Sequence, residues 1–282
     1  MRLLEKNIFL ILFTFIFIFN CDGQKNENTG PLNLSAAQGI DEWKTTIIYD
    51  NYEYDPLMKS AWGFSCLFET RHIRILFDTG GDSSVLIHNM EKLKLDISKI
   101  DAIVLSHIHG DHVGGLFAVL NRNPNLTVFV PATFPTDFKK QIQEKANKLV
   151  ELDSATQLFP NIYSTGPLGR RISEQSLVVN LKQGLFVITG CAHPGIDNII
   201  QFAADTFNRN PHIVIGGFHL LRTNNSDIEE IIEIFDKLKT AWVGPSHCTG
   251  DEARKLFREH YKSSFIDLGV GRILDQHILE NN

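Results

Sequence analysis

Residues 106–112, with the sequence Ser-His-Ile-His-Gly-Asp-His, decide how the rest of this chain is interpreted. They directly follow the apolar run 102–105, which is typical of a buried strand. Imidazole nitrogens and carboxylate oxygens are the ligands that borderline divalent metals such as zinc prefer, and one such group alone binds too weakly to hold an ion. Because three of the 11 histidines fall within this stretch, we favour a metal site over a polar surface loop.

The order of residues in this stretch indicates two metal positions. A strand followed by a tight loop that contains glycine lets His107 and His109 project in the same direction. Asp111 and His112 lie past the turn and point toward a neighbouring position. The stretch therefore predicts two adjacent metal ions that share one loop.

The pattern H-x-H-x-D-H after an apolar strand resembles the metallo-β-lactamase fold superfamily. Three further stretches resemble its motifs, namely 76–81 (LFDTGG), 189–195 (TGCAHPG) and 245–250 (PSHCTG). The sequences GCAHPG, GGFHL and PSHCTG are similar to those of a narrower branch, that of dihydropterin-ribofuranosyl-aminobenzene-phosphate synthase. The resemblance covers roughly Thr45 to the end of the chain.

The resemblance implies an α/β fold, a four-layer αββα sandwich with its site at one edge of the sheets. It also implies that the ligands form two groups: His107, His109 and His193 for one ion, and Asp111, His112 and His247 for the other. Asp78 is expected to lie behind the ligands and orient them by hydrogen bonds. The alternative for Asp78 is an ordinary carboxylate at the end of a strand.

The expected chemistry is hydrolysis. Three protein ligands with an open position are typical of catalytic zinc, whereas structural zinc is closed by four ligands, usually with Cys. A water molecule shared by two cations loses its proton near neutral pH and becomes a hydroxide nucleophile. Asp111 is a catalytic candidate because it can also orient that hydroxide. We expect two zinc ions, with iron or manganese as the alternative metals.

His219, in the stretch Gly-Gly-Phe-His-Leu at 216–220, is a second catalytic candidate. Many superfamily relatives have a metal-bridging Asp at this place, and this chain has no carboxylate between Asp205 and Asp227. A neutral imidazole cannot bridge two cations through one nitrogen. His219 is therefore expected to bind one metal or to face a substrate phosphate, and the alternative is a histidine packed at a strand end.

Several neighbours of the motifs bear on ligands and substrate. We expect Cys191 and Cys248 to be small buried thiols rather than zinc ligands. Gly195 begins a helix directly after His193, so its free amides can hold an anionic group. Residues 170, 171, 174 and 175 (Arg, Arg, Glu, Gln) are expected to line the pocket or to be ordinary loop residues. Trp62 stands where relatives tend to have His, which leaves the branch's substrate open for this chain.

The composition, with 43% hydrophobic and 21% charged residues, is typical of one large soluble α/β domain. The net charge of −6 argues against a nucleic-acid partner, because such binding needs a basic surface. The expected partner is a small molecule that carries an ester or a phosphate.

The N-terminus predicts export and a lipid anchor. Residues 1–20 predict a signal peptide, because Arg2 and Lys6 lie beside an apolar run that is shorter than the ~20 residues of a spanning helix. Cys21 ends a stretch that resembles a bacterial lipobox, with Asn20 as a departure. We expect a lipidated Cys21, a flexible tether over 21–40 and a catalytic domain over 41–282. The predicted location is the cell envelope, outside the cytoplasm, and a plain anchor or a buried helix are the alternatives.

Alternating strands and helices are expected along the domain. The strands are expected at 45–49, 62–69, 72–77, 102–105, 127–130, 176–181, 185–189, 213–216 and 241–244. The helices are expected at 83–95, 114–120, 136–150, 195–207, 227–239 and 252–261.

Two other functions stay open beside a hydrolase. One is an iron-dependent oxidoreductase of the same fold, although its flavodiiron version has Glu where His109 stands here. The other is a lipid-tethered protein that binds metal without turnover.

Overall fold

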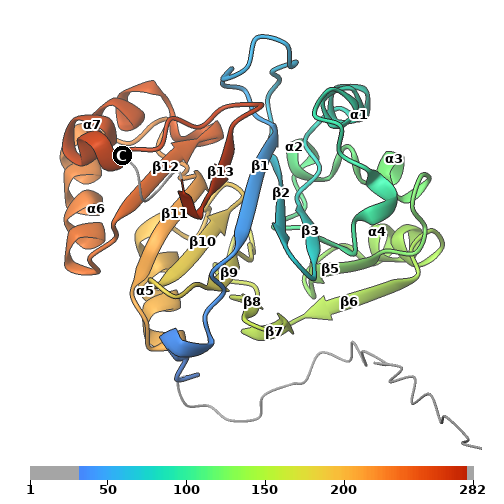
Figure 1. Ribbon diagram of the computed structural model, residues 1–282, viewed down its shortest axis with the longest axis horizontal. Helices are drawn as coiled ribbons and strands as arrows, with labels where there is room; N and C mark the ends of the chain where they lie inside the picture. The colour runs from blue at the N-terminus through green and yellow to red at the C-terminus, as the bar shows by residue number, and fades with distance from the viewer. Residues whose placement is uncertain (1–31, 278–282) are drawn as a thin grey trace, which may run out of the picture.

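The computed structural model describes residues 32–277 and contains two large β-sheets that pack face to face (Figure 1). Helices cover the outer face of each sheet, so the layers run helix, sheet, sheet, helix. The αββα sandwich expected from the sequence is confirmed.

The first sheet has seven strands in the spatial order β13-β1-β2-β3-β4-β5-β6. Their bounds are β1 (Trp43–Tyr49), β2 (Ser65–Thr70), β3 (Arg74–Phe77), β4 (Ala102–Val104), β5 (Thr127–Pro131), β6 (Lys148–Leu152) and β13 (Ile273–Asp275). Strands β3 to β6 run parallel. Their C-terminal ends therefore meet at one edge of the sheet.

The second sheet has six strands in the order β12-β11-β10-β9-β8-β7. Their bounds are β7 (Thr156–Phe159), β8 (Ile162–Ser164), β9 (Leu177–Asn180), β10 (Leu185–Thr189), β11 (Pro211–Gly217) and β12 (Trp242–Ser246). Strands β10, β11 and β12 are parallel, so their C-terminal ends also share one edge.

The helices fall into two sets along the chain. Those associated with the first sheet are α1 (Ser83–Lys92), α2 (Gly110–Val113), α3 (Leu116–Leu120) and α4 (Thr136–Gln143). Those that cover the second sheet are α5 (Ile196–Phe207), α6 (Asn225–Lys237) and α7 (Asp251–Tyr261). Asp82 caps α1 by accepting hydrogen bonds from the amides of Ser84 and Val85.

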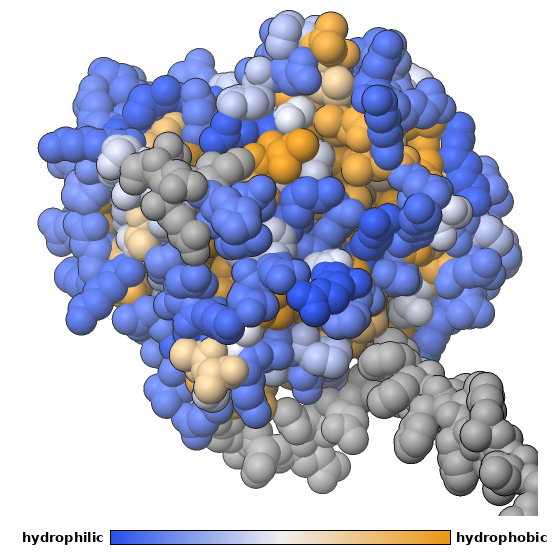
Figure 2. Space-filling model, in the orientation of Figure 1, coloured by the Kyte–Doolittle hydropathy of each residue, from blue (hydrophilic) through white to orange (hydrophobic). Residues whose placement is uncertain are grey.

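Three apolar clusters hold these layers together. One lies between the sheets and contains Phe68 and Phe186, whose rings meet edge to face at 6.1 Å. The other two lie beneath the outer helices of each sheet. Burying one such aromatic side chain contributes about 2 kcal/mol. The face drawn in Figure 2 is mostly hydrophilic, with an apolar area toward its upper right.

The predicted helix over 136–150 is wrong in its second half. Helix α4 ends at Gln143, and residues 148–152 form β6, which pairs in parallel with β5. Residues 143–145 are polar and compatible with a continued helix. Residues 148–152, however, gain backbone hydrogen bonds to β5 as a strand at the edge of the sheet. The sequence also failed to predict β7, β8 and β13, which are only three or four residues long.

Residues 32–40, which fall within the predicted tether over 21–40, contact the folded domain. Leu32 and Leu34 pack against the cluster beneath α5 to α7, and residues 36–38 form a short 3-10 turn. The predicted signal peptide and Cys21 lie outside the described residues. No helix within 32–277 is long and apolar enough to cross a membrane.

Candidate metal centre

Every predicted ligand follows the C-terminal end of a parallel strand. The loop that carries residues 107–112 follows β4, His193 follows β10, and His247 follows β12 directly. Asp78 follows β3, which pairs with β4, and His219 follows β11. Because the parallel strands of both sheets end at the same edge of the sandwich, residues that are far apart in sequence meet there.

The first group of ligands consists of His107, His109 and His193, hereafter the triple-histidine group. Their ligand atoms all lie within 4.8 Å of one another, although His193 comes from the other sheet. Burial and the nearby His112 lower the pKa of His107 to about 3. His107 is therefore neutral at physiological pH, and a neutral imidazole is the form that binds a metal.

Glu174 fixes the triple-histidine group from behind. Its carboxylate is buried and accepts hydrogen bonds from the backbone amides of residues 190–193 and from Nδ1 of His193 at 2.8 Å. Burial alone disfavours the charged carboxylate, but these bonds hold the pKa of Glu174 well below its usual range. Glu174 is neither a pocket-lining residue nor a loop charge, so the sequence expectation was wrong.

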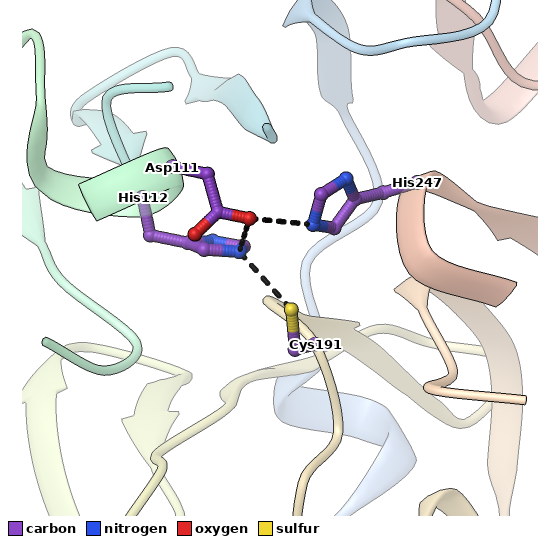
Figure 3. Close-up of side chains that lie close together, drawn as sticks. All are labelled: Asp111, His112, Cys191 and His247. Atoms are coloured by element: carbon purple, nitrogen blue, oxygen red, sulfur yellow. Dashed lines mark hydrogen bonds and ion pairs between the residues drawn. The ribbon is translucent and has the colours of Figure 1, made fainter. Parts of the chain in front are cut away.

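The second group of ligands consists of Asp111, His112 and His247, joined by Cys191, hereafter the mixed group (Figure 3). Asp111 Oδ2 lies 3.7 Å from His112 Nε2 and 3.4 Å from His247 Nε2. His112 Nε2 lies 3.1 Å from Cys191 Sγ. The structure thus brings together the three residues assigned to the second ion, and it adds a thiol that the sequence assigned only to packing.

Asp78 lies behind the mixed group and contacts one of its members. Its carboxylate accepts hydrogen bonds from the backbone amide and hydroxyl of Ser106 and lies 2.7 Å from Nδ1 of His112. Burial raises the pKa of Asp78 to about 7. Gly190 allows the two sheets to meet here, because a Cβ atom at that position would lie 2.1 Å from the Ser106 hydroxyl.

The backbone is strained where it delivers these side chains. Asp78, Ala192, His219 and His247 all have a φ between 48° and 61°, in the left-handed region that non-glycine residues rarely adopt. Such a conformation costs about 1 kcal/mol or more for each residue and persists where the surrounding structure imposes it. Asn51 helps to impose it on His247, because its amide contacts both Nδ1 and the carbonyl of that residue.

His219 lies beside the triple-histidine group without joining it. Its side chain is exposed, and its ring centroid lies 4.5 Å from that of His193. His219 instead forms a ligand-like group with Cys191 and Cys248. A hydrogen bond with Cys248 raises the pKa of His219. This position is compatible with both expected roles, as a ligand and as a contact for substrate.

The rim of the site has two features that bear on substrate. Trp62 is 51% exposed, and its ring lies 4.8 Å from that of His247. Gly169 lies close to Pro194, so the exposed Arg170 and Arg171 that follow it are carried by a loop beside the site.

The start of α5 is less suited to an anion than the sequence indicated. Helix α5 lacks a side-chain cap, which leaves its first amides free, as expected. Its first turn contains Asp197, however, whose negative charge opposes a phosphate there. Gln175, predicted for the pocket, is buried and donates to the carbonyl of Leu105 instead.

Two buried nitrogen atoms support the fit of this site to metal ions. Nε2 of His107 and Nε2 of His247 are buried without a hydrogen-bond partner, although the Asp111 carboxylate lies 3.4 Å from the latter, while Nδ1 of each ring is hydrogen-bonded. Leaving such an atom unsatisfied costs about 1–3 kcal/mol. A metal bound at Nε2 would satisfy each atom, and the partner of Nδ1 would fix the ring for that purpose. The donor set therefore fits two divalent cations.

Comparison with known proteins gives a consistent result. A profile of the metallo-beta-lactamase superfamily matches residues 63–247. The chain is 28% identical over 292 aligned positions to a 7,8-dihydropterin-6-methyl-4-(beta-D-ribofuranosyl)-aminobenzene-5'-phosphate synthase of Methanocaldococcus jannaschii, covering 86% of this chain and 99% of that protein.

Two solved structures have the same fold. Tm1679, described as a metal-dependent hydrolase of the beta-lactamase superfamily, has a TM-score of 0.71 and 28% identity over 82% of this chain and 98% of its own. YhfI from Bacillus subtilis, a metallo-beta-lactamase fold protein, has a TM-score of 0.64 and 15% identity, covering 83% of this chain and 100% of its own.

Proposed function

This chain belongs to the metallo-β-lactamase superfamily, and from that premise we propose that it is a hydrolase with two divalent cations, most simply zinc. The substrate would be an ester or phosphoester of a small organic molecule. The observation that carries the proposal is the pair of unsatisfied Nε2 atoms, on His107 and His247, buried within two adjacent ligand groups. Surface histidines would find water or protein partners instead.

The residues divide into binding and orienting roles. The triple-histidine group would hold one cation, and Asp111, His112 and His247 would hold the other. Bound cations supply Lewis acidity and lower the pKa of water to near neutrality. The carboxylate of Asp111 is partly exposed, so it can accept a hydrogen bond from attacking water and aim it. Glu174 and Asp78 keep the histidine rings in position from behind.

The rim supports a substrate that is aromatic and carries an anionic group. Trp62 offers an exposed ring face beside His247, and aromatic stacking contributes about 1 kcal/mol. Arg170 and Arg171 offer guanidinium groups, which bind phosphate by paired hydrogen bonds. The negative net charge of −6 is spread over the chain, so this local basic pair would favour a small phosphorylated ligand over a polymer.

A second candidate is synthase chemistry on a pterin and an aminobenzene ribose phosphate. The observation that favours it is the relative from M. jannaschii, whose sequence aligns over 99% of its length. Stacking on Trp62 and a phosphate contact with the two arginines suit that substrate class as well. The two functions differ in whether water or a second organic molecule attacks.

The test is a substrate screen with protein of known metal content. We expect release of alcohol or phosphate from a small ester or phosphoester, lost on chelation and restored by zinc. Product formation only when a pterin and an aminobenzene ribose phosphate are both supplied would favour the synthase. Normal metal content with no turnover in either assay would contradict both, and would favour a protein that only binds metal.

We also propose that the chain is tethered to a membrane through a lipid on Cys21, outside the cytoplasm. The support is the sequence alone, since the apolar run 7–19 precedes a lipobox-like stretch. Detergent partitioning tests it. We expect the full chain in the detergent phase and the Cys21→Ser variant in the aqueous phase, and equal partitioning of the two would contradict lipidation.

A further inference from the structure

Cys191 is a buried thiol that the proposed function leaves without a role. Its side chain lies in the mixed group, where its Sγ and the ligand atoms of Asp111, His112 and His247 are all within 4.8 Å of one another (Figure 3). The four side chains come from three separate loops, after β4, β10 and β12. A thiol among three metal-binding side chains is a possible ligand, so its geometry can be compared with that of a metal site.

The distances fit the edges of a tetrahedron around one ion. Zinc binds nitrogen or oxygen at about 2.0–2.2 Å and sulfur at about 2.3 Å, which puts tetrahedral ligand atoms about 3.3–3.8 Å apart. Three of the six separations in the mixed group are 3.1 Å from His112 Nε2 to Cys191 Sγ, 3.7 Å from Asp111 to His112, and 3.4 Å from Asp111 to His247. The other three are no longer than 4.8 Å. Shifts of a few tenths of an ångström would complete the coordination shell.

The backbone of Cys191 is fixed in a way that points its thiol at this group. Its amide donates to Glu174 at 2.8 Å, and its carbonyl lies 3.4 Å from the Sγ of Cys248. The next residue, Ala192, has a φ of 61° and donates to the same carboxylate. Glu174 therefore holds His193 toward the triple-histidine group and, through the same turn, Cys191 toward the mixed group.

The charge of the mixed group favours a thiolate at position 191. Asp111 is the single carboxylate in the mixed group, and His219 stands where a second carboxylate would be expected from the resemblance. We infer that the Cys191 thiolate is the fourth ligand of the second cation, and this inference rests on the proposed two-cation site. On coordination the thiol proton passes to solvent, as occurs for thiols bound to divalent metals. One carboxylate and one thiolate then balance the charge of a divalent ion.

This assignment gives the two cations different tasks. Four protein ligands close the second position, as in structural zinc sites, whereas the triple-histidine group leaves its position open for water or substrate. A thiolate also selects zinc, cobalt or cadmium over magnesium or manganese, which prefer oxygen. The second position should therefore discriminate more strongly between these metals than the first.

Cobalt spectroscopy on the full chain under reducing conditions tests the inference. A thiolate bound to Co²⁺ gives a sulfur-to-cobalt charge-transfer band in the near ultraviolet, which histidine and carboxylate ligands do not give. We expect two cobalt ions per chain and this band in the wild type. We expect Cys191→Ser to lose the band and to bind one of the two ions about tenfold more weakly or worse.

Cys248→Ser is the matched control, because Cys248 is equally buried and adjacent but belongs to a different group, with Cys191 and His219. It should keep the band, as should Cys66→Ser in β2. The inference is overturned if the wild type binds two ions without the band, if it binds fewer than two, or if the band survives in Cys191→Ser. If Cys191→Ser does not fold, survival of the band in both Cys248→Ser and Cys66→Ser still assigns it to Cys191 among the cysteines that the structure describes.

Turnover of the zinc-loaded wild type, measured on the same preparation, separates this inference from the proposed function. A charge-transfer band without hydrolysis would support the thiolate ligand and count against the hydrolase. Hydrolysis without the band in protein that holds two cobalt ions would do the reverse.

Discussion

The triple-histidine group and the mixed group both take residues from the loop that follows β4, yet they differ in the charge of their side chains. The first has three imidazoles and no charged side chain among its ligands, and its negative charge stands behind it on Glu174. The second carries Asp111 among its ligands and is supported by Asp78 and Asn51. A neutral group with an open position suits exchange of water and substrate, whereas a charged, crowded group suits retention of an ion.

This difference also explains why the two groups respond differently to mutation. A change at Asp111 removes the one carboxylate of the mixed group, which we propose also orients the attacking water. A change at Glu174 alters no candidate ligand itself. It removes hydrogen bonds that hold the turn 190–193, which carries His193. The following predictions use these differences, from the largest effect to the smallest.

Asp111→Asn should abolish hydrolysis while leaving the fold largely intact. Asn keeps the shape of the side chain but lacks the charge that holds the second cation and orients water. We expect turnover to fall about a thousandfold or more, with an unchanged circular dichroism spectrum. Turnover above about a tenth of the wild-type value would contradict the two-cation mechanism.

Glu174→Gln should weaken the triple-histidine group more than the mixed group. The variant loses part of a set of four backbone hydrogen bonds and the contact with the His193 ring. We expect affinity for one cation to fall about 10–100-fold and the free energy of unfolding to fall by about 2 kcal/mol or more. Metal titration and denaturant unfolding measure these effects. Glu91→Gln, on an exposed face of α1, should change neither.

His219→Asn should lower turnover about tenfold, the effect of one lost contact to a charged group, while the first cation stays bound. Asn is chosen because it tolerates the left-handed backbone that His219 adopts. Steady-state kinetics combined with metal analysis measures both quantities, and His72→Asn, on an exposed residue of another surface, is the control. Normal turnover with normal metal content would mean that His219 only packs at the end of β11.

Trp62→Ala should have the smallest effect, a rise in KM of about threefold with little change in kcat. The exposed ring lies beside His247 and is expected to stack on substrate without touching the reacting atoms. Trp62→Phe should restore most of the affinity. An equal loss in kcat would indicate that Trp62 supports the position of His247 instead.

The candidate ligands could be proposed from the sequence because four of them are concentrated in one stretch. Three histidines and Asp111 lie in one short loop, and the strand that precedes them fixes the edge of the sheet where they lie. Apolar periodicity was likewise sufficient for α5 and α6, whose buried faces are continuous. The fold class follows from the alternation of such strands and helices.

The residues that the sequence did not assign depend on contacts made across the sandwich. Glu174 is buried because the turn 190–193 folds over its carboxylate, and nothing in its own stretch indicates this. Cys191 was assigned to packing because a free Cys is usually a small buried side chain. The direction of its thiol depends on the left-handed Ala192 that follows it. Local sequence does not specify that backbone conformation.

Native mass spectrometry of the full chain after zinc loading tests the central claim most directly. The two adjacent ligand groups predict two zinc ions per chain in the wild type, and one in His112→Ala, which removes a ligand from the mixed group alone. A wild-type chain that binds no zinc or only one ion, or a variant that still binds two, would contradict a two-cation centre.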